Sequence, residues 1–513
     1  MSDEQPLLSY TGHPFVDVGL ATILAFREKT DIATLNDEDM IAVAEYIEQN
    51  YTVQPLKSFL NVAFMNSGFT QTAFEKQPEK RQIYAHKVAR EYANVQDSAG
   101  ERCVFTGESA SAVSWSVDDS LVMGRAFREH ISLLNGRDVI NFVSGGDAGI
   151  AVSGKALLCI QFFPIGCAKC GGRLLAVHSD NLDLMWDFAN KFFQANRSAI
   201  LQAQTTGSSK LPEAPHSART LLIKTFLAIE TKRLDAIAEE EPAAITAYHL
   251  SNSGQSNPLD DRSPPLAIYH LPLQITVFLA TVSGGEYKQQ WNEIAKRAWQ
   301  RPPQPKKKGQ IRGDEPFTPR YNRLYEDLFR LPDNARFFVS AHFLRVPRRN
   351  VSTDDPTRYY TLADDAYLVS WKLVKLFLKE VIRMSETRIE EIRAMGDRLA
   401  DYVFRMDDRR FFRSFFRENR AFEFRTHLIK ANMSAIKAGM PPLFTLDPYT
   451  KVFHLDLFED GTETLRVDWK FARDLVLIRM IEQLYNNGWI GKNPDLVAEA
   501  AEPITDEQDE ENR

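Results

Sequence analysis

The sequence predicts an α+β protein: a mixed N-terminal body with short β-sheet elements, followed by a C-terminal α-helical bundle. Short β-rich apolar runs, bounded by glycines, occur in the N-terminal part at residues 139–143 and 156–163. From about Thr361 onward the apolar residues follow helical spacing. The 513 residues are 44% hydrophobic and 26% charged, which is ordinary for globular proteins and excludes wholesale disorder or a fibrous repeat.

Composition and breaks divide the chain into four expected regions. Residues 1–204 form the mixed body, and residues 205–360 form a middle region. Residues 361–493 form the helical bundle, and residues 494–513 form an acidic tail that we expect to be disordered. Two loops rich in Thr, Ser, Gly and Pro, a basic loop with five prolines and a final Gly-Pro break support this division: residues 205–216, 251–265, 301–319 and 439–442.

Individual elements follow from the local apolar spacing. Residues 266–279 are strand-like, in addition to the two runs above. In the bundle one stripe advances by three or four residues at a time: Tyr367, Trp371, Val374, Leu378 and Ile382. Helices are expected at residues 41–47, 56–60, 182–201, 287–300, 367–382, 409–437 and 467–485.

The net charge of -7 is concentrated at one end of the chain. Residues 494–513 hold eight Asp or Glu and one Arg, so the residues before them are neutral overall. Within that neutral part, residues 297–350 hold thirteen Lys or Arg against five Asp or Glu, and residues 405–437 hold nine against four. Two basic stretches in an acidic chain indicate contact with nucleic acid.

Both basic stretches are interleaved with aromatic residues. On a helix, Arg409, Arg413 and Arg417 fall along one face, while the phenylalanines between them turn towards a core. The basic loop supplies a second set of cations: Lys306, Lys307, Lys308 and Arg312. We expect both sets to bind phosphates without regard to sequence, and the alternative is that they form solvated surfaces.

A CxxC pair at Cys167 and Cys170 is the strongest ligand-like feature. Cys103 begins a similar turn, but Thr106 occupies the second cysteine position, so the fourth ligand is missing unless His178 or water supplies it. A structural zinc is the one cofactor that this pattern suggests. The alternative is a degenerate site of buried or free thiols.

Residues 149–156 match the first seven positions of a phosphate-binding P-loop, but Ala156 stands where the magnesium-binding hydroxyl belongs. Lys155 on this glycine-rich turn is therefore a candidate for contact with a phosphate backbone. The zinc-deaminase signature and the Gly-x-Ser-x-Gly elbow are both absent from the sequence. We expect no enzymatic activity.

Three stretches together resemble the CxxC-CxxC family, the large subunits of type I, subtype B, CRISPR Cascade complexes. They are residues 11–19 (TGHPFVDVG), residues 61–70 with Asn66 and Phe69, and the two cysteine turns. The resemblance extends over most of the chain, and Thr106 is its clear departure. It implies a C-terminal bundle similar to the Cascade small subunit, most of which internal translation from Met384 or Met395 would release.

The resemblance also implies a non-catalytic subunit that recognises the short motif beside the target (the PAM), helps unwind DNA and helps form the R-loop. The implied partners are guide RNA, target double-stranded DNA and its displaced strand, the backbone, handle-binding and small subunits, and a helicase-nuclease or a transposition adaptor. Amide and hydroxyl side chains beside Gly68 suit base edges, although Asn66 and Thr70 are equally suited to capping local structure. The PAM-binding candidates are Asn66, Ser67, Thr70 and Gln71.

Two other classes of function stay open: a nucleic-acid-processing enzyme with an unrecognised metal site, and a structural interaction protein. The first residues lack the layout of a signal peptide, and the longest apolar run is too short to span a membrane. We therefore expect a cytoplasmic chain without a membrane partner.

Overall fold

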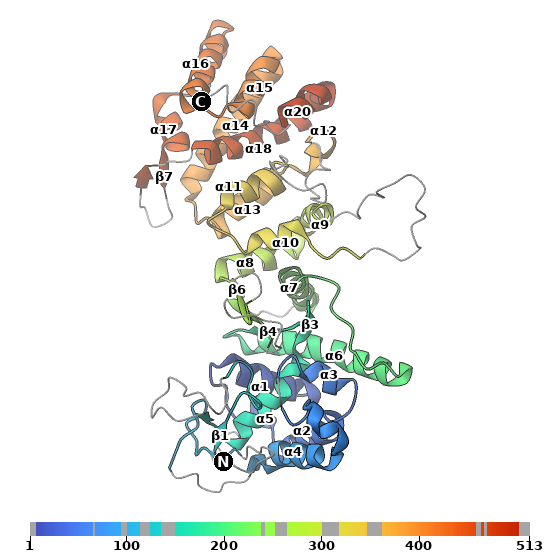
Figure 1. Cartoon of the computed structure of the whole chain (residues 1–513). Helices are drawn as coiled ribbons and strands as arrows, with labels where there is room; N and C mark the ends of the chain where they lie inside the picture. The colour runs from blue at the N-terminus through green and yellow to red at the C-terminus, as the bar shows by residue number, and fades with distance from the viewer. Residues whose placement is uncertain are drawn as a thin grey trace, which may run out of the picture. The chain divides into compact units, whose positions relative to one another are not determined.

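The computed structural model is mostly helical, with three small antiparallel sheets, and divides into two compact units (Figure 1). Unit 1 consists of residues 1–229 and 239–273, and unit 2 consists of residues 230–238 and 274–513. The structure describes residues 7–64, 67–93, 100–112, 124–134, 149–236, 242–251, 264–299, 318–345, 362–457, 463–465 and 469–501.

Unit 1 combines helices with two of the sheets. Its helices are α1 (Pro14–Phe26), η1 (Ile32–Thr34), α2 (Asp37–Asn50), α3 (Leu56–Leu60), η2 (Thr72–Lys76), α4 (Pro78–Arg90), η3 (Glu91–Ala93), α5 (Gly154–Phe162), η4 (Phe163–Gly166), α6 (Leu182–Thr206) and most of α7 (Ala218–Asp235). Its strands are β1 (Arg125–Ala126), β2 (Ile150–Ala151), β3 (Ala168–Cys170), β4 (Arg173–His178), β5 (Ile245–Leu250) and β6 (Leu266–Leu271).

The described residues of unit 2 are helical apart from one small hairpin. Its helices are α8 (Leu273–Val282), η5 (Gly285–Tyr287), α9 (Lys288–Arg297), α10 (Arg323–Leu328), α11 (Ala335–Phe338), η6 (Val339–Phe343), α12 (Leu362–Asp365), η8 (Ala366–Leu368), α13 (Trp371–Glu380), α14 (Glu386–Met406), α15 (Arg409–Arg417), α16 (Ala421–Lys437), α17 (Leu446–Phe453), α18 (Trp469–Asn486), α19 (Trp489–Lys492) and α20 (Pro494–Ala501). The hairpin pairs β7 (Leu455–Leu457) with β8 (Glu463–Leu465).

The main sheet of unit 1 has the strand order β3-β4-β5-β6, and all of its pairs are antiparallel. Ala176 of β4 lies opposite Tyr248 of β5, which in turn lies opposite Ile268 of β6. β4 is buried over its four central residues, whereas β6 alternates between partly buried and exposed residues. Helices α1 and α6 contact β4, and they therefore cover the most buried strand of the sheet.

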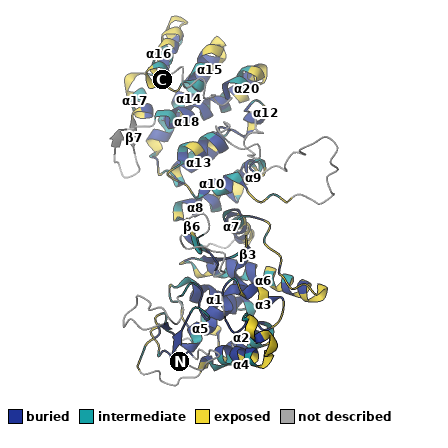
Figure 2. Ribbon diagram, viewed as in Figure 1, coloured by how far each residue is buried: buried dark blue, intermediate teal, exposed yellow. Residues whose placement is uncertain are grey.

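Helix α1 is the centre of unit 1. All of its residues from Phe15 to Ala25 are buried, and it contacts α5, α6 and β4 (Figure 2, where α1 is dark blue). A helix that other elements surround is mostly apolar on all its sides, and α1 carries only Asp17 and Thr22 as polar residues between Phe15 and Ala25. Gly19 lets α5 approach α1 closely, since a Cβ built on Gly19 would lie 2.1 Å from the carbonyl oxygen of Cys159.

A buried carboxylate fixes the start of α1. Asp17 accepts hydrogen bonds from the backbone amides of Thr11 (2.7 Å) and Gly12 (2.8 Å) and from the hydroxyl of Thr11 (2.9 Å). Its Oδ2 also lies 3.2 Å from Nε2 of His178, at the end of β4. Burial alone would raise the pKa of Asp17, but the bonds to His178 and Thr11 outweigh it and hold that pKa below its usual value.

In unit 2, α14 and α18 form the central helix pair. Gly396 of α14 allows their close contact, because a Cβ there would lie 2.6 Å from Cβ of Arg479 on α18. Arg479 donates to Asp397 of α14 at 2.6 Å, which joins the two helices at the edge of the contact. The apolar side chains of α18 from Leu475 to Ile478 are fully buried, as expected for a helix that is covered on several sides.

The prediction of a strand at residues 156–163 is wrong. These residues form α5, which begins at the N-cap Ser153 and is buried from Ala156 to Phe162. An uninterrupted apolar run has neither the alternation of a half-buried strand nor the polar face of a surface helix, so periodicity could not distinguish the two. The other N-terminal run, residues 139–143, lies outside the described residues.

Other expectations have mixed outcomes. Residues 266–279 are a strand only as far as Leu271 and then enter α8. Residues 494–501, expected to belong to a disordered tail, form α20, with Val497, Ala500 and Ala501 buried. The C-terminal region is helical as expected, but residues 409–437 form two helices, α15 and α16. Trp371, Val374 and Leu378 of the expected stripe are buried on α13, whereas Tyr367 lies before that helix and is exposed. The chain forms two units, whereas we expected divisions after residues 204 and 360.

Within the described residues, no helix has the length and apolar character of a membrane span.

Replacing Gly19 by Ala should destabilise unit 1. The added methyl would overlap the backbone of α5, which can move only with its whole helix, and such overpacking costs about 1–3 kcal/mol in the free energy of unfolding. Urea denaturation monitored by circular dichroism measures this cost. Gly491→Ala on α19 is the control, since no atom lies within 4 Å of its added Cβ; equal effects of the two substitutions would contradict the packing.

Asp17 should make stability depend on pH in the acid range. Its pKa is lowered on folding, so its contribution is present above the unfolded value of about 3.9 and is lost as pH falls through the lower folded value. Asp17→Asn is therefore expected to cost about 1–3 kcal/mol near neutral pH and less below about pH 4. Urea denaturation of both proteins across this range tests the prediction, and a difference in stability that does not change with pH would refute it.

Candidate nucleic-acid interface

Helix α15 forms the candidate interface in unit 2 because its two faces differ in chemistry. Asp408 caps the helix by accepting from the backbone amide of Phe411 at 2.9 Å. The four phenylalanines are buried, so the arginines occupy the outer side. The described basic face consists of Arg409, Arg410, Arg413, Arg417 and, just after the helix, Arg420.

Aromatic contacts hold α15 on the rest of unit 2. Phe411 meets Tyr402 of α14 with ring centroids 5.6 Å apart, and Phe412 meets Trp489 of α19 at 5.1 Å. Phe415 meets Phe424 of α16 at 5.1 Å. Because three neighbouring helices fix the buried side of α15, the arginine side chains start from a rigid base, which lowers the entropy lost when they bind a ligand.

The arginines of the basic face have acidic neighbours. Arg413 forms an ion pair of 3.2 Å with Glu499 of α20, and Arg417 donates to the backbone carbonyl of Glu499 at 3.2 Å. Arg409 lies 3.1 Å from Asp407. The side chains of Arg409 and Arg413 remain more than half exposed, at 60% and 53%. Exposed pairs of this kind are weak, so a phosphate can replace the carboxylate.

An open pocket of about 510 Å³ lies at the start of α15. Its lining is mostly polar: Tyr402, Met406, Asp407, Asp408, Arg409, Arg410 and Ser434. The hydroxyl of Tyr402 donates to Asp408 at 2.7 Å, and burial together with this contact raises the pKa of Tyr402 to about 12. Tyr402 therefore stays neutral at physiological pH, and the cations at the pocket are Arg409 and Arg410.

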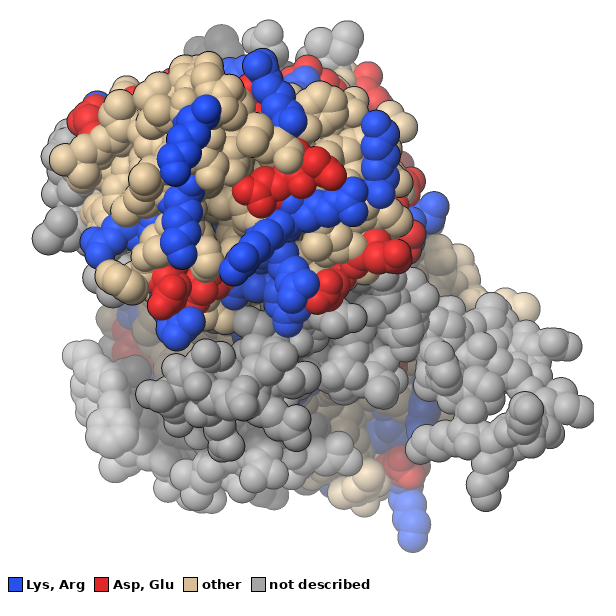
Figure 3. Space-filling model, turned by 90° about the horizontal axis from the view of Figure 1, so that it is seen from above, with Lys and Arg blue, Asp and Glu red and all other residues tan. Residues whose placement is uncertain are grey.

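Figure 3 shows this side of unit 2, where α15, α16 and α20 lie in Figure 1, and Lys and Arg side chains alternate there with Asp and Glu. The basic surface is therefore mixed with acidic groups and not uniformly positive. The acidic groups lower the positive potential of this surface, so an anionic ligand would have to displace carboxylates from Arg409 and Arg413.

No family model, curated protein or solved structure matches this chain.

The proposed PAM-binding residues differ in their burial and in their hydrogen-bond partners. Asn66 lies outside the described residues. Ser67 is fully buried, and its hydroxyl lies 3.4 Å from that of Thr70, which also donates to the carbonyl of Phe64 at 3.2 Å. Ser67 and Thr70 thus stabilise a local turn, and for Thr70 this is the local structural role that the sequence left open. Gln71 stays partly exposed, and its carbonyl accepts from Arg81 at 3.0 Å.

Lys155 and the turn before it do not form an open phosphate site. The amide of Gly154 donates to Ser111 and that of Ala156 donates to Ser153, both at 3.3 Å. A Cβ on Gly154 would lie 2.3 Å from the carbonyl oxygen of Tyr92, so protein covers this helix start. Lys155 itself donates to the carbonyl of Leu7 at 3.2 Å. A helix does follow the glycine-rich turn, contrary to the sequence-based expectation of a strand, but its first amides already have protein partners.

The three cysteines proposed as metal ligands are buried as free thiols. Cys167 donates to the carbonyl of Phe163 at 3.2 Å, and Cys170 donates to that of His216 at 3.4 Å. Burial raises the pKa of the Cys167 thiol well above its usual value. His178, considered as a fourth ligand, faces Asp17. In the described part of the chain, no three His, Cys, Asp or Glu side chains gather so that they could hold a metal ion. The described residues near Cys103, Cys167 and Cys170 therefore do not fit a zinc site.

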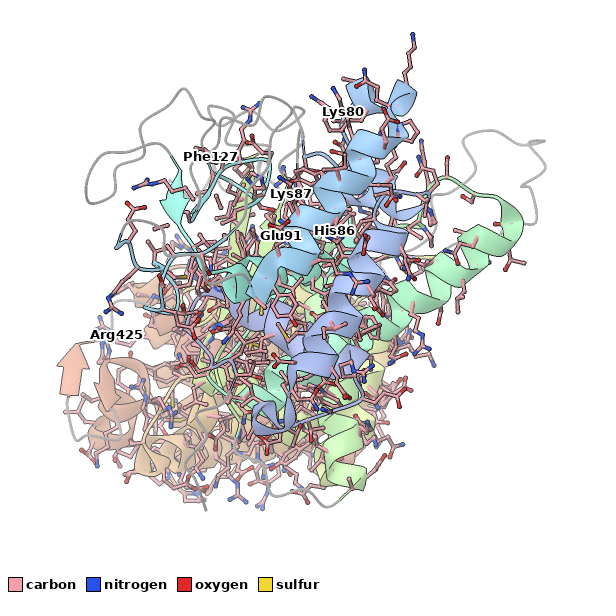
Figure 4. The ribbon with its side chains drawn as sticks, turned by 90° about the horizontal axis from the view of Figure 1, so that it is seen from below. Lys80, His86, Lys87, Glu91, Phe127 and Arg425 are labelled. Carbon is pink, nitrogen blue, oxygen red and sulfur yellow. The ribbon has the colours of Figure 1, made fainter. Side chains whose placement is uncertain are left out.

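The second half of the predicted surface, the loop with Lys306, Lys307, Lys308 and Arg312, lies outside the described residues. Unit 1 contains a further basic helix, α4. Lys80 and Lys87 are seven residues apart and therefore share one side of this helix, where Figure 4 shows them in sequence along α4. Arg90, one turn further on, is tied to Glu48 of α2 at 2.8 Å.

The basic character of α4 is visible in the sequence, although it was not predicted. Residues 76–90 hold five Lys or Arg and one Glu, a ratio higher than in either basic stretch that we selected. The stretch is short and its phenylalanine content is low, so it does not stand out by length or by aromatic interleaving. Each unit thus carries a basic helix, α4 in unit 1 and α15 in unit 2.

Metal analysis of the purified chain is expected to find well below one zinc per molecule. The thiols of Cys167 and Cys170 donate hydrogen bonds to backbone carbonyls, and chelation should leave the melting temperature unchanged. Elemental analysis and thermal melting with and without chelator measure both quantities. Stoichiometric zinc that is lost on Cys167→Ser would show that the cysteines form a metal site.

Proposed function

We propose that this chain is the non-catalytic large subunit of an RNA-guided DNA-binding complex of the type I, subtype B, Cascade family. The observation that carries the proposal is the basic face of α15, where exposed arginines stand on a helix anchored by four buried phenylalanines. Such a face holds a phosphate backbone without reading bases, which is the task of a subunit that leaves sequence recognition to a guide RNA.

The division of the chain supports the same proposal. Unit 1 mixes helices and sheets and carries the basic helix α4, while unit 2 is almost wholly helical and carries α15. In the proposed complex, unit 1 inspects the PAM and helps to open the duplex. Unit 2 takes the place of a small subunit along the guide and displaced strand. The chain thereby helps R-loop formation and the recruitment of a helicase-nuclease or a transposition adaptor.

Gln71 is the member of the PAM-binding set whose position in the structure still suits that role. Its side chain is partly exposed, and its backbone is fixed by Arg81 of α4, the basic helix of unit 1. An amide beside a row of cations can meet a base edge while the cations hold the backbone. Ser67 and Thr70 would act through the turn that precedes Gln71.

Replacing Arg409, Arg410 and Arg413 together by Ala should weaken DNA binding equally for all sequences. Each arginine removed from a phosphate lowers the slope of log affinity against log salt by about one, so the slope should fall by up to about three. Fluorescence anisotropy with two unrelated duplexes at several salt concentrations measures both effects. Lys372→Ala/Lys379→Ala/Arg393→Ala is the matched control, because it removes three exposed cations from α13 and α14.

Two results would contradict the proposal at different levels. A loss of affinity confined to one sequence would show that α15 reads bases. Failure of the chain to co-purify in a stoichiometric ribonucleoprotein, when it is produced with a guide RNA and the products of its neighbouring genes, would rule out the subunit role even if DNA binding remains. Metal-dependent cleavage of DNA by the purified chain would favour the rival class, a nucleic-acid-processing enzyme.

A further inference from the structure

Helix α16 has two apolar faces, and only one of them is covered. Phe424, Leu428, Ala431 and Ala435 are buried against the rest of unit 2. On the opposite side, four large apolar side chains are exposed to solvent: Phe422 at 65%, Ile429 at 47%, Met433 at 54% and Ile436 at 51%. We call these four residues the α16 seam. Figure 2 shows the exposed side of α16 in yellow.

The seam is a row along α16 that is interrupted once, by Thr426 between Phe422 and Ile429. Its members are separated by seven, four and three residues, so at 100° per residue they lie within a strip roughly 60° wide and about 21 Å long. Spacings of seven, four and three are those of the inward-facing positions of a coiled coil. No other described helix carries more than two exposed large apolar residues. Single exposed residues are ordinary on protein surfaces, whereas a row of four indicates an interaction surface.

Cations border the seam on both sides. Arg425 lies on one side, with its guanidinium 5.5 Å from the ring centre of Phe422. Lys430 and Lys437 lie on the other side, where Glu423 is the one acidic residue. These positions correspond to those that flank the contact in a coiled coil and that choose its partner by charge. A partner that carries carboxylates at the facing positions would complement three cations.

Other occupants fit the seam less well. A second copy of α16 would bring two sets of these cations together and place Lys430 near its own equivalent. Nucleic acid stacks on aromatic rings, and three of the four seam residues are aliphatic. The chain beyond Ala501 is acidic, but Ile504 is its one large apolar residue, so it has too few side chains to cover four.

We propose that the α16 seam binds an amphipathic helix of a partner protein, in which acidic residues flank an apolar stripe about two heptads long. The two helices would lie side by side as a short coiled coil, with the partner's carboxylates opposite Arg425, Lys430 and Lys437. This inference is independent of the proposed nucleic-acid binding, because it concerns a different helix and a different chemistry. Loss of one activity therefore leaves the other measurable.

The test uses a labelled peptide of three heptads with Leu at the inward-facing positions and Glu at the flanking ones. A matched peptide carries Lys in place of every Glu. Fluorescence anisotropy with the full chain, in about 0.1 M salt, is expected to show at least about tenfold tighter binding of the Glu peptide than of the Lys peptide. Ile429→Ser and Met433→Ser should each weaken binding of the Glu peptide about tenfold. Leu201→Ser, at an exposed position on α6, is the control and should leave it unchanged.

Several outcomes would overturn the proposal. Equal binding of the two peptides, or binding that Ile429→Ser does not change, would mean that the seam selects no acidic helix. Dimerisation of the chain alone that Ile429→Ser abolishes would assign the seam to a second copy. Binding to phosphatidylserine vesicles that the same substitution abolishes, without binding of the Glu peptide, would assign it to a membrane surface. Far-UV circular dichroism of each variant confirms that α16 is still folded.

Discussion

The burial of four phenylalanines on one nine-residue helix determines the surface of unit 2. A helix as short as α15 does not form alone in water, so its stability comes from the burial of its four phenylalanines. Phe411, Phe412 and Phe415 lie against rings of α14, α19 and α16, respectively. Because the phenylalanines occupy the buried side of α15, its arginines lie on the solvent-facing side. The same contacts locate α16, whose Phe424 lies against both Phe415 and Trp469 of α18. The packing of the core and the position of the charges are therefore consequences of one arrangement.

The parts that the sequence predicted well are those where polar and apolar residues alternate with a clear period. Arg409, Arg413 and the phenylalanines between them can satisfy burial and solvation at once only as a helix with two faces. Residues 156–163 lack that contrast, since α5 is covered on all sides, and so its secondary structure depends on tertiary contacts such as that between Cys159 and Gly19. In α20 the buried Val497, Ala500 and Ala501 have helical spacing, but the surrounding acidic residues concealed it.

The candidate sites were harder to predict than the fold, because a side chain's partner is not visible in one sequence. Ser67 and Thr70 have the chemistry to read bases, yet their hydroxyls hold a turn together. The stretch from Thr11 to Gly19 has structural tasks as well. Asp17 accepts hydrogen bonds from the backbone that precedes α1, and Gly19 allows the close contact between α1 and α5. Residues that carry the resemblance thus explain how unit 1 is built, while the cations on which the proposed DNA contact depends lie on α4 and α15.

The cations that border the α16 seam have a second consequence for the isolated chain. These cations oppose self-association of the chain, because two exposed seams that approach each other bring like charges together before their apolar side chains touch. That protection has a range of about 10 Å in 0.1 M salt and about 3 Å in 1 M salt. Molar salt should therefore promote self-association through α16. The same salt would weaken the proposed contact between the arginines of α15 and a polyanion, so the two surfaces would respond to salt in opposite senses.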